Sequence, residues 1–108
     1  MKYKYRYTDV PSLIQKDREE YEAMCFICKR GGVMEFHHIL NGSAKSVSEK
    51  IGAWVWLCPE CHRRIHNYRH GKDNRIYDPQ WLKKLCQEVY ETSHTRDEWM
   101  ALVHKSYL

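Results

Sequence analysis

Two C-x2-C pairs constrain the fold of this chain more than any other feature of its sequence. Cys25 and Cys28 form the first pair, and Cys58 and Cys61 form the second, with 29 residues between the pairs at positions 29–57. Two intervening residues let both sulfurs of a pair turn toward one ion, so each pair can supply two ligands of a tetrahedral site. The spacing therefore predicts a structural Zn²⁺ held by all four cysteines.

The size of the chain makes such a site important for stability. The chain has 108 residues, enough for one small domain, and domains of this size are often marginal without a metal or a partner. The sequence has no run of about 18 apolar residues, and its N-terminus lacks the apolar core of a secretory signal. We therefore expect a cytoplasmic protein with no membrane contact, and in that compartment paired cysteines usually bind metal.

Periodicity and capping signals predict one small α+β domain over residues 1–108. Its core is expected at about residues 23–70. Two β-rich runs are predicted there, VMEFHHIL at 33–40 and AWVWLC at 53–58, joined by a polar loop that can hold a short helix. A helix is predicted to start at Pro59 and to end near Gly71.

Flanking segments are predicted on both sides of this core. Residues 1–22 are expected to form a basic arm or strand and then a helix, for which Ser12 and Gln15 make a capping box. Residues 78–105 are predicted to form two helices. These helices have clear N-cap residues, Asp78 and Thr95. Cys86 falls on the apolar stripe of the first of them, which favours a core residue over a metal ligand.

A four-cysteine site leaves all seven histidines of the chain unused. His37 and His38 end the first β-rich run, while His62 and His66 lie four residues apart on one helical face. Because His62 directly follows the last zinc cysteine, the four-cysteine site is expected to bring the end of the first β-rich run close to this face of the helix. Three converging imidazoles would make a second metal site, and a fourth could act as a general base near neutral pH.

The alternative to a second metal site is one mixed site. In that arrangement the first cysteine pair would bind the same ion as the two helical histidines, and the remaining histidines would lie on the surface. The mixed ligand set would be Cys25, Cys28, His62 and His66.

The charge of the chain favours an anionic partner. Its 18 basic and 14 acidic residues give a formal net charge of +4. Residues 1–7 hold three basic residues and no acid, and residues 60–75 hold five basic residues against two acids. Within the second segment, Arg63, Arg64 and Arg69 are candidate phosphate contacts, as a nucleic-acid-binding surface requires. The alternative is an ordinary solvated surface.

The order of these motifs resembles the HNH endonucleases, some of which carry an accessory zinc held by four cysteines. The shared pattern is C-x2-C, a strand ending in HH, a second strand and C-x2-C-H-x3-H, over about residues 23–70. Residues 35–66 together with the ending DEWMALVHKSYL are also similar to small HNH-type proteins of bacteriophages and prophages, including the RecA-dependent phage nuclease family. The resemblance implies a ββα-metal (treble-clef-like) core with flanking helices, DNA as substrate and a bacterial host cell.

The resemblance also implies a role for each matching histidine. His38 matches the general base that activates a water molecule. His37 matches a ligand of the catalytic ion, Mg²⁺ or another divalent ion, and His62 and His66 match the ligands on the helix. The ion would act as a Lewis acid on the phosphodiester.

Four further positions bear on this resemblance. Ala53 occupies the place of the family's central asparagine, which braces the loop between the strands, and Asn41 could replace that brace. Glu35 lies two residues before the first histidine, so it could orient a metal ligand, but a glutamate at such a position is more often only exposed. His70 continues the i, i+4 spacing and would suit the C-terminal end of the predicted helix.

Two other functions remain open. The first is a non-catalytic zinc module that binds nucleic acid through its basic arm and helix, which the departure at Ala53 favours. The second is a protein-binding adaptor that displays the four tryptophans and eight tyrosines. A pure binder has no need of HH and H-x3-H around one point, so the nuclease is preferred. Its expected partners are DNA and a second subunit or a recombination or packaging protein.

Overall fold

The computed structural model describes residues 7–15 and 23–108 of the chain. This part of the protein has a mixed α+β fold, as the sequence predicts, with a two-stranded sheet and four α-helices. Its elements in chain order, with η for short 3₁₀ turns, are β1 (Glu35–His38), η2 (Gly42–Ala44), α1 (Lys45–Ile51), β2 (Trp54–Leu57), α2 (Pro59–His66), η3 (Arg75–Tyr77), α3 (Pro79–Tyr90) and α4 (Arg96–Val103). No helix in these ranges is long and apolar enough to cross a membrane.

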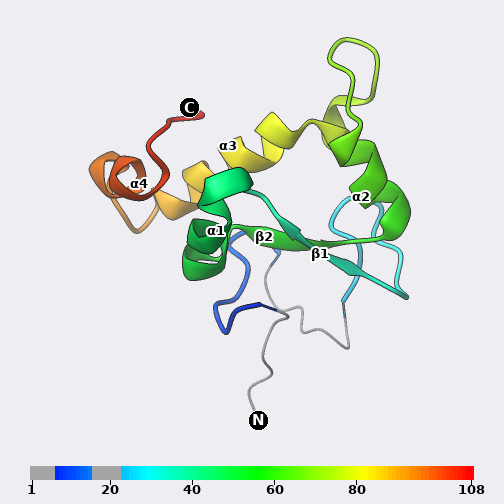
Figure 1. Cartoon of the computed structure of the whole chain (residues 1–108), viewed down its shortest axis with the longest axis horizontal. Coiled ribbons are helices and arrows are strands. Elements are labelled where there is room, and N and C mark those ends of the chain that lie inside the picture. Colours follow the sequence, from blue (N-terminus) through cyan, green and yellow to red (C-terminus); the bar gives the residue numbers. More distant parts are fainter. Residues whose placement is uncertain (1–6, 16–22) are drawn as a thin grey trace.

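The two strands form an antiparallel hairpin at the centre of the fold (Figure 1). The register pairs Glu35 with Leu57, Phe36 with Trp56, His37 with Val55, and His38 with Trp54. Successive side chains of a strand point to opposite faces, so the first and third pairs share one face and the second and fourth share the other. The two adjacent histidines therefore lie on opposite faces of the hairpin.

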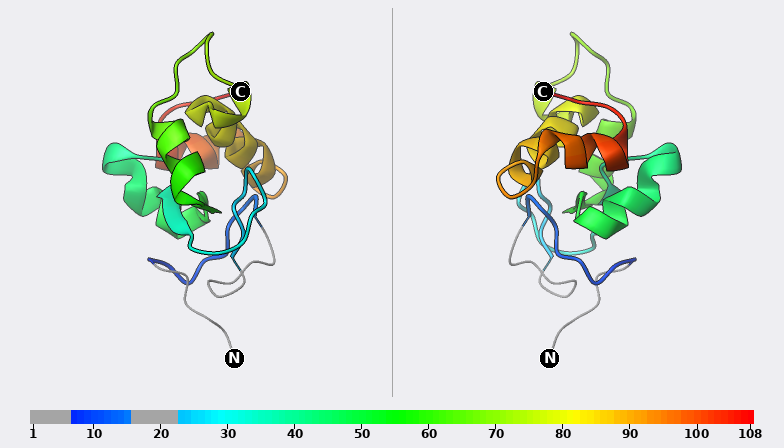
Figure 2. Two further views of the ribbon diagram at one scale, coloured as in Figure 1. Left: turned by 90° about the vertical axis from the view of Figure 1, so that its right-hand side faces the viewer. Right: turned by 90° about the vertical axis from the view of Figure 1, so that its left-hand side faces the viewer.

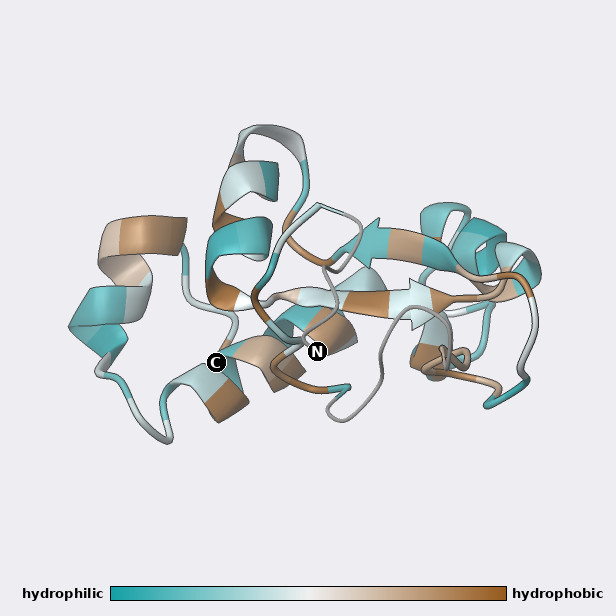
Figure 3. Cartoon of the chain, turned by 90° about the horizontal axis from the view of Figure 1, so that it is seen from below, coloured by the Kyte–Doolittle hydropathy of each residue, from teal (hydrophilic) through white to brown (hydrophobic). Residues whose placement is uncertain are grey.

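The main hydrophobic core lies on the His37 face, under α2, α3 and α4 (Figure 2). The most deeply buried residues of these elements meet there, among them Val55, Leu57, Ile65, Leu82 and Trp99. Burying one leucine side chain fully contributes about 1.5–3 kcal/mol, so these contacts stabilise the arrangement of helices on the hairpin. Cys86 also lies in this core with no exposed surface, as predicted. Most of α2 outside this contact is hydrophilic (Figure 3).

The other face of the hairpin carries an aromatic cluster. Phe36 stacks on Trp54 with ring centroids 4.7 Å apart, and both tryptophans of β2 are buried. Residues before the first cysteine cover this face through side-chain bonds to β2. The Ser12 hydroxyl donates to the carbonyl oxygen of Trp54, and the backbone N–H of Trp56 donates to Gln15 Oε1 at 2.7 Å. The hairpin is thus enclosed from both sides.

A short helix, α1, fills the polar loop between the strands and ends at Ile51, with Gly52 as its C-cap. This glycine has a φ of 85°, and a Cβ here would collide with the carbonyl oxygen of Pro11. The buried Ser48 hydroxyl donates to the carbonyl oxygen of Leu40 at 2.9 Å and accepts its N–H at 2.8 Å. Ser48 therefore braces the loop, whereas Asn41 is exposed and makes no side-chain cap bond.

The predicted end of the zinc-proximal helix is wrong. α2 ends at His66, not near Gly71. The Asp73 carboxylate accepts the backbone N–H of Arg69 at 2.7 Å and also binds its guanidinium, so residues after the helix close a separate loop. Gly71 has a φ of 80° and lies in that loop.

The predictions for the two ends of the chain have different outcomes. Residues 13–15 form bends instead of the start of a helix, although the Ser12 hydroxyl accepts the backbone N–H of Gln15 at 3.0 Å as predicted. Bonds to β2 hold the backbone here in a non-helical path. Residues 16–22 and 1–6, which hold the rest of that helix and the basic arm, lie outside the described residues. The C-terminal helices are confirmed as α3 and α4, and both have the predicted N-caps, Asp78 and Thr95.

Candidate metal centres

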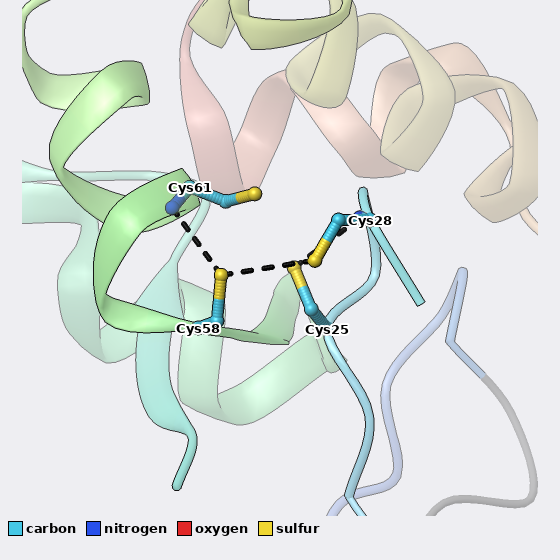
Figure 4. Close-up of side chains that lie close together, drawn as sticks. All are labelled: Cys25, Cys28, Cys58 and Cys61. Carbon is cyan, nitrogen blue, oxygen red and sulfur yellow. Dashed lines mark hydrogen bonds between the residues drawn. The ribbon is translucent and has the colours of Figure 1, made fainter. Parts of the chain in front are cut away.

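Four cysteine sulfurs converge beside the start of α2 (Figure 4). Cys25 and Cys28 come from the loop before β1, and Cys58 and Cys61 come from the beginning of α2. All four Sγ atoms lie within 4.8 Å of one another, and Cys28 Sγ is 3.8 Å from Cys58 Sγ. A tetrahedral zinc with bonds of about 2.3 Å requires sulfur–sulfur distances of about 3.8 Å. These cysteines could therefore hold a zinc ion.

Backbone N–H groups point at the first sulfur of each pair. The N–H of Cys28 donates to Cys25 Sγ, and the N–H of Cys61 donates to Cys58 Sγ, both at 3.4 Å. Burial raises the pKa of Cys25, but N–H bonds from Cys28 and Cys58 outweigh it and bring that pKa to about 7. Burial and then the neighbouring sulfurs raise the pKa of Cys61. Four thiolates can therefore coexist here only beside a cation.

A second group of potential metal ligands consists of three histidines. His37 comes from β1, and His62 and His66 come from successive turns of α2. Their ligand nitrogens lie within 4.8 Å of one another, and the two Nε2 atoms of the helical histidines are 3.0 Å apart. The ring of His37 is centred 5.1 Å and 5.6 Å from the other two rings. The predicted second cluster is therefore brought together, and the mixed cysteine–histidine set is not.

The two clusters differ in how they meet solvent. His37 is only 5% exposed, whereas His66 is exposed at the other edge of the three-histidine cluster. Structural zinc sites have four protein ligands, while catalytic sites have three protein ligands and an open position. The cysteine cluster has the composition of the first kind, and the histidine cluster has that of the second.

Glu35 orients one of these histidines. Its Oε1 lies 2.6 Å from His62 Nδ1. An ionised carboxylate only accepts hydrogen bonds, so Nδ1 carries the proton and Nε2 presents a lone pair to the cluster. Metal-binding histidines commonly donate their other N–H to a carboxylate, which fixes the ring and makes it a stronger ligand. Of the two alternatives for Glu35, the structure shows the contact with a potential metal ligand.

The surroundings of His37 and His66 favour their neutral form. Burial first, and then the neighbouring His62 and His66, lower the pKa of His37 to about 3. Burial, His62 and Lys45 also lower the pKa of His66. The neutral imidazole is the form that binds metal, so the lowered pKa values of these two residues favour metal binding. The influence of Lys45 also indicates that the start of α1 lies near the exposed edge of the cluster.

His38 does not join the three-histidine cluster. It lies on the opposite face of β1, where its Nε2 is 2.8 Å from Glu49 Oε2. Its side chain is 15% exposed, and its ring packs against Tyr7 with centroids 5.4 Å apart. Donation from Nε2 to the carboxylate leaves a lone pair on Nδ1. The residue thus has a fixed ring and one nitrogen able to take a proton.

The three predicted phosphate contacts lie on or just after α2. Arg63 and Arg64 are exposed on the helix, and Arg64 binds Glu60 at 3.1 Å. Arg69 lies beyond the helix end and forms an ion pair with Asp73 at 3.1 Å. Exposed pairs of this kind contribute little to stability, so these arginines are accessible to an anionic ligand.

Sequence patterns missed several residues around the sites. Ser48, Glu49 and Lys45 all belong to α1, which the sequence indicated only as a short helix within a polar loop. No motif spacing connects them to the histidines, because only the hairpin fold brings α1 beside the strand. His70 was expected at a helix end but is exposed in the loop after α2.

Comparison with known proteins finds no matching family model, curated protein or solved structure. The chemistry of the two clusters and of the residues around them is therefore what bears on function.

Proposed function

We propose that this chain is a metal-dependent nuclease of the HNH type that hydrolyses phosphodiester bonds of DNA. The observation that carries the proposal is the three-histidine cluster, with its open edge and its supporting carboxylate from Glu35. A hairpin followed by a helix holds this cluster, and the four-cysteine site joins the start of α2 to the loop before β1. This is the arrangement expected of a ββα-metal core with an accessory structural zinc.

The three histidines of the cluster are the proposed ligands of the catalytic ion. His37, His62 and His66 would hold a divalent ion, Mg²⁺ or another, and their neutral imidazoles suit the softer ions Mn²⁺, Ni²⁺ and Zn²⁺ best. When bound, such an ion supplies Lewis-acid stabilisation of charge on the phosphate and the leaving oxygen. Lys45 lies near the exposed edge of the cluster, so it is a candidate contact for the same phosphate.

His38 is the proposed general base. Glu49 accepts from its Nε2, so Nδ1 is the nitrogen that would take a proton from the attacking water. His38 and His37 lie on opposite faces of β1. The scissile phosphate must therefore lie at the end of this strand, where both side chains can approach it. Ala53 supplies no brace at the family's asparagine position, and Ser48 offers that support through its two bonds to Leu40.

The test is conversion of supercoiled plasmid to nicked or linear DNA in the presence of Mg²⁺, Mn²⁺, Ni²⁺ or EDTA. His38→Ala is expected to lower the rate by about 10²-fold or more, as for removal of a general base. His94→Ala is a matched control, because His94 is exposed in the turn between α3 and α4. Equal cleavage by wild type and His38→Ala, at equal zinc content, would remove His38 from the mechanism.

A non-catalytic zinc module that binds nucleic acid is the second candidate function. The observation in its favour is that His38 lies outside the histidine cluster and is bound to Glu49. This candidate predicts DNA binding by wild type without cleavage under any of the ions above. It also predicts that His38→Ala leaves DNA affinity unchanged.

A further inference from the structure

A pocket opens beside the histidine cluster, between α2 and the segment that leads to η3. Its volume is about 430 Å³, within the range of small-molecule sites. Arg63 and Asn67 line it, and each directly follows a histidine of the cluster along α2. Neighbouring residues of a helix lie about 100° apart around its axis, so the pocket and the cluster occupy adjoining faces of α2. In Figure 1 the loop after α2 projects beyond the end of this helix.

The charges around the pocket suit a ligand with one anionic group. Three arginines and one aspartate line it, which leaves a net charge of +2. Arg63 is exposed, and its guanidinium makes no hydrogen bond or ion pair with any residue that the structure describes. The carboxylate of Asp73 accepts hydrogen bonds and repels a second anionic group. The lining therefore combines a phosphate-binding side with an acceptor for N–H groups.

Much of the pocket wall is held in place by its own contacts. The guanidinium of Arg64 lies 5.2 Å from the ring centroid of Tyr77 and donates to its hydroxyl at 3.2 Å. Arg69 is fixed by Asp73. Asn74 accepts the N–H of Ile76 at 3.0 Å through Oδ1, so its amino group remains as a donor. A wall with fixed groups loses little entropy when a ligand binds.

We propose that this pocket binds one unpaired nucleotide of a DNA strand whose neighbouring phosphate lies at the three-histidine cluster. Arg63 binds the phosphate of that nucleotide. The amides of Asn67 and Asn74 and the carboxylate of Asp73 bind the edge of its base. The inference rests on the proposed nuclease function and names the form of its substrate.

The requirement for an unpaired nucleotide follows from the shape of the site. A base inside a duplex is stacked and paired, and it enters a concave pocket only after it leaves the helix, at a cost of a few kcal/mol. An unpaired base enters without that cost. Single-stranded or branched DNA is therefore the preferred substrate, and intact duplex is the poorer one.

The experiment is fluorescence anisotropy of the zinc-loaded full chain, without other divalent ions, so that no cleavage occurs. A labelled eight-nucleotide single strand is compared with the duplex of the same sequence, with deoxynucleoside monophosphates and inorganic phosphate as competitors. We expect the single strand to bind about tenfold or more tightly than the duplex, as a base-flipping cost of a few kcal/mol requires. Monophosphates are expected to compete better than inorganic phosphate.

Variants locate the site. Arg63→Ala is expected to weaken single-strand binding about tenfold, as for loss of a charge-assisted contact. Asn67→Ala should weaken competition by monophosphates and leave inorganic phosphate unchanged. Arg96→Ala is the matched control, since Arg96 is an exposed arginine on α4, paired with Glu91.

Three results would overturn the inference. Equal affinity for single strand and duplex would remove the unpaired nucleotide, and equal competition by inorganic phosphate would reduce the pocket to an anion site. Unchanged binding by Arg63→Ala would place the nucleotide elsewhere. Plasmid cleavage together with any of these results would leave the nuclease in place without the pocket. Single-strand binding in the pocket without cleavage would support the nucleotide pocket and contradict the proposed nuclease.

Discussion

The contact between Glu35 and His62 provides a graded test of the histidine cluster. In Glu35→Gln the side chain keeps its length and an oxygen that can accept the Nδ1 proton, but it loses its charge. The charge strengthens His62 as a ligand, because it favours a proton on Nδ1 and electron density on Nε2. The substitution should therefore weaken binding of an ion by the cluster without touching any of its three ligands.

The structure sets the expected size of the effect. Removing such a supporting carboxylate typically costs about 10–100-fold in metal affinity. The 2.6 Å distance indicates a strong bond, but the Glu35 side chain is 45% exposed, so solvent screens part of its charge. We expect about tenfold weaker binding for Glu35→Gln, at the lower end of that range. Glu35→Ala also removes the acceptor and should fall nearer the upper end.

The assay is calorimetric titration of the zinc-loaded protein with Ni²⁺ at pH 7.5, in a buffer that does not bind metal. Glu49→Gln is the matched control, because it removes the same charge on the opposite face of β1 and should change affinity less than twofold. The reasoning is refuted if His62→Ala abolishes binding while Glu35→Gln and Glu35→Ala bind as tightly as wild type.

Three other perturbations test the rest of the structure. Cys25→Ser should leave the chain unfolded by circular dichroism at 25 °C. Structural zinc contributes about 10–16 kcal/mol, and small domains have only about 5–15 kcal/mol of stability. Cys86→Ala is the control and should stay folded. Without added divalent ion, the free energy of unfolding should fall as the pH drops from about 6.5 toward 3, by up to about 1.4 kcal/mol per pH unit. The reason is that unfolded His37 takes up a proton that the folded residue, with a pKa of about 3, does not. Denaturant titrations of His37→Asn should show a smaller dependence of the free energy of unfolding on pH. Ser48→Ala should lower stability by about 2–4 kcal/mol in urea, because Leu40 loses two buried hydrogen bonds, and a result equal to that of the exposed Ser46→Ala would contradict the proposed brace.

Local patterns predicted much of this fold. The cysteine spacing, the two β-rich runs and the i, i+4 pair of His62 and His66 depend on neighbours in the sequence or on helix geometry, and the structure brings them together as expected. The caps of α3 and α4 are equally local, since Asp78 and Thr95 bond to N–H groups two or three residues ahead.

Features that depend on polar contacts between side chains and the backbone were not predicted. The helical pattern after Pro59 continues in the sequence beyond His66, but Asp73 reaches back to Arg69 and closes a loop instead. The bonds of Ser48 to Leu40 depend on how α1 folds back on β1. A hydrophobic pattern cannot show such polar contacts, because they contribute no periodicity.

The positions of the adjacent histidines were only partly predicted. Strand alternation alone places His37 and His38 on opposite faces. The sequence could not indicate that Glu49 lies beside His38 on its face of the strand and binds it. The choice of Nδ1 as the proposed base nitrogen of His38 follows from that contact and not from any motif.

The most direct test of the central claim is plasmid cleavage by zinc-loaded wild type and His66→Ala, with Mn²⁺ added and the zinc content of each protein measured. His66 is exposed at the edge of the histidine cluster and belongs to a different ligand set from the four cysteines. If that cluster binds the ion that cleaves DNA, His66→Ala retains one zinc per chain and loses cleavage by about 10²-fold or more. Undiminished cleavage by His66→Ala, with its zinc in place, would contradict the account.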